Sequence, residues 1–194
     1  MSELRVRRLD AEGLRVIAHP LRMRIIATLR LDGPATASGL AERLGVSSGL
    51  TSYHLRALAA ADFVEDDPDH PAKGRERWWR SAQDMTSWTA GTTDLDTDAA
   101  AAEEWLAGYA ARRSMEWVDS WLDRRRDDPP EWQGVSGTSD YLLDVTPGEL
   151  DELLEAITAL LTPHLRRVEG RADGVEGSAD VRLLLQTFLR GDDE

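Results

Sequence analysis

Three stretches near the start of the chain repeat apolar residues every three or four positions, which predicts three short helices. Their apolar positions are Leu21, Ile25, Ile26 and Leu29, then Leu40, Ala41 and Leu44, and then Thr51, Leu55 and Leu58. Pro20 suits the first turn of the first helix, because a proline there loses no hydrogen bond. Only a tight turn at Gly45 separates the second and third helices, so these two must cross steeply and share one small core.

The third predicted helix carries small and hydrogen-bonding side chains beside one cation on the side away from its apolar stripe. These residues are Ser47, Ser48, Gly49, Ser52, Tyr53 and Arg56. No Asp or Glu lies between Ser47 and Ala61, so no side chain of this stretch repels phosphate. Such a face suits a helix that lies in the major groove of DNA. The pattern therefore predicts a DNA-binding helix-turn-helix, in which His54 either fixes local packing or contacts DNA.

A predicted hairpin follows this motif directly, with strands over 62–66 and 75–81 around a loop rich in Asp and Pro. The aromatic and branched side chains that such a sheet packs are Phe63, Val64, Trp78 and Trp79. A hairpin directly after a recognition helix is a wing. Lys73, Arg75 and Arg77 are placed on it to meet phosphates or the minor groove beside the site.

Residues 18–81 resemble the winged helix-turn-helix of ArsR-type bacterial transcriptional regulators. Three segments carry the resemblance: His19-Pro-Leu-Arg, Ser52-Tyr-His-Leu-Arg-Ala-Leu58 and Gly74-Arg-Glu-Arg-Trp-Trp-Arg80. They follow one another in the family's order and spacing. The resemblance implies a homodimer that represses transcription from palindromic operators and releases the DNA when an effector binds.

The absence of cysteine separates this chain from the best-known metal sensors of that family. Those members use Cys pairs in the helix before the turn, here around Ser38 to Glu42, so thiolate sites for soft metals are excluded. The four histidines (His19, His54, His70 and His164) all lie outside the long helix where another metal site of the family occurs. We therefore expect no metal, no cofactor and an effector that is not a metal.

Catalysis has no support in the sequence. The chain has no Cys nucleophile, no Gly-rich phosphate loop and no His-Glu-x-x-His motif. Its many carboxylates are scattered without a pattern that pairs an acid with a base. We expect that the protein is not an enzyme.

A long amphipathic helix is predicted over 97–126, and Pro129 and Pro130 stop it. Its apolar stripe is wide and rich in tryptophan, which is typical of cores and interfaces alike. We expect this helix to form core and a dimer interface, or to line a pocket for an organic effector. The residues assigned to that role are Trp105, Tyr109, Trp117, Val118 and Trp121.

A small α+β unit is predicted over 139–190. Residues 139–145 form its first predicted strand, and Thr146-Pro-Gly-Glu149 is a capping box that opens an amphipathic helix. Residues 181–189 are predicted as a second strand, with a helix as the alternative, and Met85 to Ala90 as a third strand. The predicted fold class is therefore mainly α with small β: an N-terminal winged helix-turn-helix, a long helix and a small α+β C-terminal unit.

Charge divides the chain at the end of the wing. Residues 1–82 hold 13 Lys and Arg against 11 Asp and Glu, whereas residues 83–194 hold 10 against 25. We therefore expect a DNA-binding domain over 1–82 and an acidic dimerisation and effector region over 83–194, which cannot hold a polyanion closely. Nothing resembles a signal peptide or an 18-residue apolar span, so we expect a cytoplasmic protein with no membrane partner. The single lysine among 22 arginines suggests a GC-rich bacterial genome.

Two functions of different class remain open. The first is a sequence-specific, homodimeric DNA-binding transcriptional regulator, a repressor that responds to a non-metal effector. The second is a winged-helix protein-interaction module that no longer binds DNA. The absence of acids on the recognition stripe and the cations of the wing favour the first.

Overall fold

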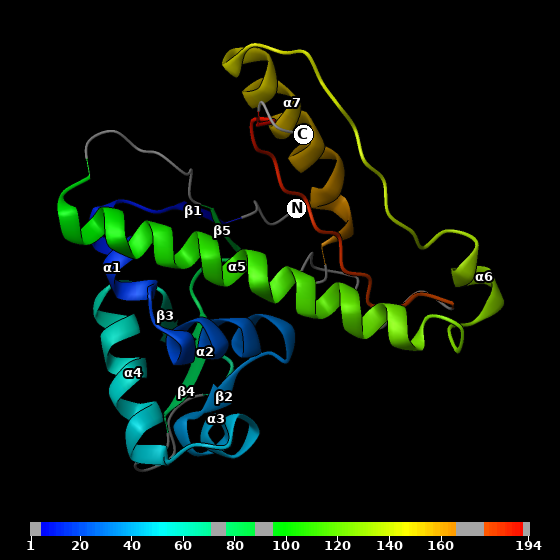
Figure 1. The fold of residues 1–194 in the computed structure, drawn as a ribbon. Helices are drawn as coiled ribbons and strands as arrows, with labels where there is room; N and C mark the ends of the chain where they lie inside the picture. Colours follow the sequence, from blue (N-terminus) through cyan, green and yellow to red (C-terminus); the bar gives the residue numbers. More distant parts are fainter. Residues whose placement is uncertain (1–4, 71–76, 88–94, 166–176, 192–194) are drawn as a thin grey trace. The chain divides into compact units, whose positions relative to one another are not determined.

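Helices make up most of the chain that the computed structural model describes, which comprises residues 5–70, 77–87, 95–165 and 177–191 (Figure 1). The helices are α1 (Ala11–Ile17), α2 (Pro20–Leu31), α3 (Ala37–Leu44), α4 (Ser48–Ala60), α5 (Thr97–Arg124), α6 (Pro130–Gln133), α7 (Pro147–Leu161) and the 3-10 helix η1 (Thr162–His164). The strands are β1 (Val6–Arg8), β2 (Ala35–Thr36), β3 (Val64–Asp66), β4 (Trp78–Ser81) and β5 (Met85–Ser87). The mainly helical class with small sheets, a winged helix-turn-helix and a long helix is confirmed. No helix in these ranges is long and apolar enough to cross a membrane.

The predicted helix-turn-helix consists of α3 and α4, and side-chain caps fix where both helices begin. Thr36 Oγ1 accepts a hydrogen bond from the Gly39 N–H (3.1 Å). Ser47 Oγ accepts one from the Leu50 N–H (3.2 Å). Gly45 ends α3 with a φ of 68°, a left-handed conformation that glycine adopts without steric cost. Local sequence signals therefore set this turn, as predicted.

The wing is part of a three-stranded antiparallel sheet with the strand order β2-β4-β3. Val64 pairs with Ser81 and Asp66 pairs with Trp79 across the hairpin. Ala35 pairs with the other edge of Trp79, so the short β2 before α3 joins the wing to the helix-turn-helix. The sheet confirms the predicted hairpin and adds a third strand. The wing tip, with Lys73 and Arg75, lies outside the described residues.

A second small sheet pairs the N-terminal β1 with β5 in parallel. Val6 lies opposite Met85, and the Arg5 N–H donates to Asp84 Oδ2 (3.0 Å) just before this pairing begins. The extended run predicted from Met85 is therefore present over 85–87. Its partner is the start of the chain and not the C-terminal unit, because a strand pairs with whichever segment the tertiary fold brings alongside it.

The chain divides into two compact units, one of Glu3–Ala111 and one of Arg112–Glu194 with Met1–Ser2. The core of the first unit holds every apolar position predicted on α2 and most of those predicted on α3 and α4. Leu106 of α5 is completely buried in this core, and Trp105 and Ala102 pack against it. The first half of the long helix is thus built into the winged-helix core. The predicted division at residue 82 stays a functional prediction.

The second unit contains α7, whose predicted capping box is present. Thr146 Oγ1 accepts from the Glu149 N–H (3.3 Å), and Glu149 Oε2 accepts from the Thr146 N–H (2.8 Å). The strands predicted over 139–145 and 181–189 are not found, because neither segment has a strand partner in the described chain. Their β-forming residues make an extended backbone, but a strand also requires a neighbour to receive its hydrogen bonds.

Candidate nucleic-acid interface

The predicted DNA-facing stripe of α4 lies on the surface. Ser47, Ser48 and Gly49 are exposed at the start of the helix, and Ser52 is half-buried one turn later. Tyr53 is 58% exposed, although it is a large aromatic residue. On the opposite side, Thr51, Leu55 and Leu58 are completely buried, as predicted. The helix is therefore divided cleanly into a packing face and a face that is free to contact a partner.

Arg56 is exposed on the same stripe, one turn after Ser52. Its Nε donates to the Ser52 backbone carbonyl (3.2 Å), so the side chain lies back along its own helix in the unbound chain. This hydrogen bond leaves the rest of the guanidinium available to a base edge or a phosphate. The exposed N–H groups at the start of α4 also favour an anion, because the helix dipole is positive there.

His54 lies beneath this stripe and not on it. It is only 4% exposed, and its ring contacts the His19 ring with the centroids 4.5 Å apart. Arg22 Nε donates to His54 Nδ1 (3.4 Å), and Arg22 Nη1 donates to the Val16 carbonyl (2.6 Å). This geometry favours the packing role for His54 over direct contact with DNA.

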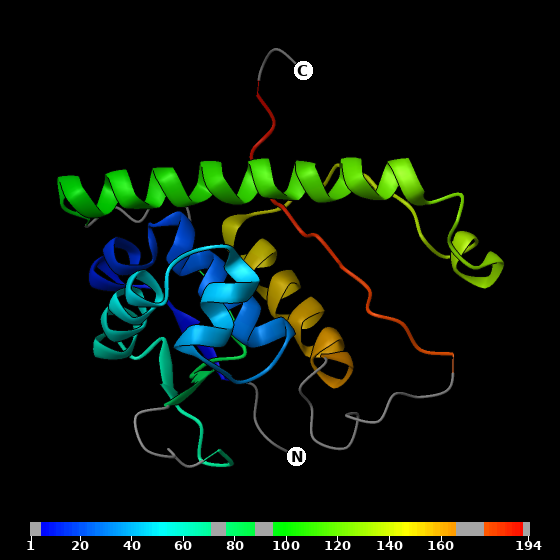
Figure 2. The same cartoon turned by 90° about the horizontal axis from the view of Figure 1, so that it is seen from below.

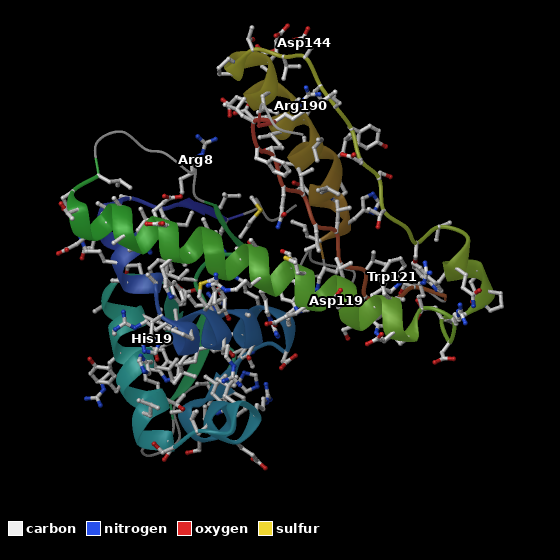
Figure 3. The ribbon with its side chains drawn as sticks, in the orientation of Figure 1. Arg8, His19, Asp119, Trp121, Asp144 and Arg190 are labelled. Carbon is white, nitrogen blue, oxygen red and sulfur yellow. The ribbon has the colours of Figure 1, made fainter. Side chains whose placement is uncertain are left out.

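Burial in this cluster also affects the protonation of its two histidines. Desolvation lowers the pKa of His54, and the nearby charges of His19 and Arg22 lower it further. The pKa of His19 is lowered by burial and then by Arg22. His19, labelled in Figure 3, caps the start of α2, and its Nδ1 accepts a hydrogen bond from the Leu21 N–H (3.1 Å). The sequence identified both histidines but gave no sign that they meet, since 35 positions separate them.

Arg77 is placed at the base of the wing, where it has a partner within the chain. Its guanidinium pairs with the Asp66 carboxylate of the neighbouring strand, with Nη2 2.8 Å from Oδ2, and lies 4.0 Å from the centre of the Trp79 ring. The side chain remains about half exposed. Asp66 thus orients Arg77 and offsets part of its positive charge. Arg77 is among the wing cations predicted from the sequence, which does not indicate this ion pair.

His70 belongs to the structure of the wing. Its Nδ1 lies 2.5 Å from Asp67 Oδ2, and its ring stacks on Trp78 with centroids 4.5 Å apart. Asp67 is buried, and Arg80 approaches its second oxygen at 3.9 Å. These contacts hold the described part of the wing loop against β4. Among the described residues, no group of three or more His, Asp or Glu side chains is arranged to hold a metal ion.

A comparison with known protein families agrees with this geometry. Residues 17–67 match the protein family described as "Helix-turn-helix domain". This segment is therefore similar to a helix-turn-helix domain. The match runs from the end of α1 through α4 to β3, so it contains the whole exposed stripe and the first strand of the wing. Family and geometry together support a DNA-binding regulator.

Several solved structures match the chain with low TM-scores. Reduced HlyU from Vibrio cholerae is 21% identical over 49% of this chain and 81% of its own, with a TM-score of 0.32. A possible transcriptional regulator for arsenical resistance is 29% identical over 62% of this chain and 97% of its own (TM-score 0.31). An apo mutant of Lactococcus lactis ZitR is 14% identical over 74% and 83% (TM-score 0.33). Because these TM-scores are below 0.5, no property of these proteins is transferred to this chain. No match was found among curated proteins.

The aromatic residues of α5 fall into two groups along the helix. Trp105 packs against the core of the helix-turn-helix unit, and Tyr109 stacks on it with centroids 5.1 Å apart. Trp117 and Trp121 belong to the second unit and are half-buried, while Val118 is exposed. Trp105 and Tyr109 are half-buried as well, so the core, dimer or effector role predicted for all five residues stays a prediction.

A shallow hollow of about 210 Å³ lies at the end of α5. Its lining residues are Trp121, Arg125, Arg126, Asp128, Gln133 and Ser136. Ligand pockets usually measure about 300–1,000 Å³ and are lined mainly by apolar groups, whereas this hollow is small and mostly polar. It is a weak candidate for the predicted effector pocket.

Proposed function

We propose that this chain is a sequence-specific transcriptional regulator that binds a palindromic operator as a homodimer. The observation that carries the proposal is the exposed stripe of α4, which combines small hydroxyl side chains, Tyr53 and Arg56 with no carboxylate. A helix with this surface can enter the major groove without desolvating an acid or repelling phosphate. In this proposal α4 reads base edges, and the wing residues Lys73, Arg75 and Arg77 meet the backbone.

The resemblance to ArsR-type regulators supplies the regulatory part of the proposal. We assign the protein as a cytoplasmic repressor whose operator is released by a non-metal effector, since the chain has no cysteine for a thiolate site. The homodimer places two copies of α4 on neighbouring half-sites, about one helical turn of DNA apart.

The first test is the selection of bound sequences from random duplex DNA by the full chain, at two salt concentrations. We expect an enriched palindrome, with affinity that falls as salt rises. Weak, salt-sensitive binding without enrichment would contradict the proposal and favour the protein-interaction module.

Arg56→Ala then tests the assigned face on the selected operator. We expect a loss of about 1–3 kcal/mol, concentrated at one base pair, because a bidentate contact to guanine is removed. Arg112→Ala is a matched control, since it removes an equal charge from an exposed position on α5. Arg75→Ala should weaken all sequences about equally and reduce the salt slope by about one. Parental affinity for both Arg56→Ala and Arg75→Ala would show that another surface binds the DNA.

A further inference from the structure

The second unit has abundant apolar side chains but no core of its own. None of its described residues, over 112–165 and 177–191, is buried. Of the large apolar side chains that are exposed in the described structure, four lie in the first unit and sixteen in the second. Contact between water and so many Leu and Val side chains is unfavourable, so exposed apolar surface of this extent points to an interaction site.

Much of this exposed surface lies on the two extended segments that flank α7 in sequence. Tyr141 is 78% exposed on the first segment, and Phe188 is 78% exposed on the second. Both segments have the composition of strands and an extended backbone, yet neither has a strand partner. Both views draw the second segment as an extended stretch without helix or strand (Figures 1 and 2). It is held to α5 of the same unit by Arg182, whose guanidinium lies 3.6 Å from the centre of the Trp117 ring.

The two segments carry opposite charge. Asp140 and Asp144 give residues 139–145 a charge of −2, and Arg182 and Arg190 give residues 181–190 a charge of +2. Apart from these charges and a few uncharged polar residues, both segments are apolar. Opposite charges on facing strands stabilise a sheet, whereas pairing either segment with its own copy would place like charges together. The chain therefore contains both halves of one complementary pair.

We propose that residues 139–145 of one copy pair as a β-strand with residues 181–190 of a second copy. In a twofold dimer the same strand pair forms twice, so each of the four segments has a strand partner. This inference rests on the homodimer of the proposed function and assigns it an interface in the second unit. The backbone of each segment then has a hydrogen-bonded neighbour. The apolar side chains of the segments and the half-buried face of α7 are removed from water in the dimer.

The charges also predict the register of the pair. If Asp140 faces Arg182, the strands are parallel and position 144 faces Gln186. If Asp140 faces Arg190, the strands are antiparallel and position 144 again faces Gln186. Facing residues in a sheet have Cα atoms about 4.5–5.5 Å apart, which lies within the range that a disulfide spans. Positions 144 and 186 are therefore suitable for cross-linking in either direction.

The test uses the full chain, in which the absence of cysteine makes every introduced thiol unambiguous. Asp144→Cys and Gln186→Cys single variants, with tags of different size, are co-expressed and oxidised. We expect a covalent heterodimer on a non-reducing gel. Asp119→Cys co-expressed with Gln186→Cys is the control, because Asp119 is exposed on α5 outside the proposed pair, and it should give no such product.

The alternative outcomes separate this inference from the function proposed above. A cross-linked monomer in the Asp144→Cys, Gln186→Cys double variant would overturn it, since the segments would then pair within one chain. A dimer by sedimentation without the specific cross-link would overturn the interface and leave the dimeric regulator standing. A monomer at all concentrations would overturn both the interface and the homodimer, while operator selection would still report on DNA binding.

A charge reversal tests the register without oxidation. Asp140→Arg should raise the dissociation constant of the dimer roughly 2- to 30-fold, because two symmetric pairs are lost. Restoration by Arg190→Asp supports antiparallel strands, and restoration by Arg182→Asp supports parallel strands. An unchanged dissociation constant would contradict the pairing.

Discussion

Replacement of Leu106 by alanine should test how firmly the long helix is joined to the helix-turn-helix unit. Leu106 is 0% exposed and is the largest buried residue of α5 in the described structure. Its burial is worth about 1.5–3 kcal/mol by transfer from water, and the cavity left by alanine adds to this value. We expect a loss of about 3 kcal/mol in the free energy of unfolding, within the range of roughly 2–5 kcal/mol for buried leucines. A unit of this size should then melt roughly 10–20 °C lower.

The assay is urea denaturation followed by circular dichroism, with Met115→Ala as the control on the same helix. Met115 is 66% exposed, so its replacement should change stability by less than about 0.5 kcal/mol. Leucine and methionine have similar helix propensities, and the difference between the two variants therefore reports packing. If Leu106→Ala lost less than about 1 kcal/mol, α5 would not be part of this core.

Two further predictions concern the helix-turn-helix itself. Gly45→Ala should lower the free energy of unfolding by about 1–2 kcal/mol because Gly45 has a positive φ, although no atom lies within 4 Å of the added Cβ. Gly49 has equally open space but no positive φ, so Gly49→Ala should stabilise α4 by up to about 1 kcal/mol. Urea titrations in which both variants changed stability in the same direction would refute this backbone argument. The pKa values of His19 and His54 are lowered in the folded state, so on acidification the unfolded chain binds protons before the folded chain does. The free energy of unfolding is therefore highest above about pH 6.5 and decreases as the pH falls below that value. Urea midpoints at pH 7.5 and 5.5 measure this loss, and His54→Gln should reduce it; an identical loss in that variant would mean that other groups titrate.

Sequence-local signals were sufficient where a few neighbouring residues decide the backbone. The proline that opens α2, the left-handed Gly45 and the Ser47 cap each act within one turn of helix, and all of them are readable in the chain. The same holds for the capping box at Thr146 and for the buried stripe of α4, whose spacing alone separates its packing face from its exposed face.

Only the tertiary structure decided which distant residues meet. Nothing in the sequence indicates that β1 pairs with β5 or that His19 contacts His54, and the spacing along the long helix does not say which core Trp105 joins. Each of these contacts joins positions far apart in the chain. Strand formation shows the reason most clearly. Residues 181–189 are rich in Val, Leu and Phe, whereas residues 62–66 include three acids, yet only the latter segment has a neighbour, and Val64–Asp66 became a strand. Helices satisfy their hydrogen bonds within one segment, whereas a strand depends on a partner that the segment's own sequence does not specify.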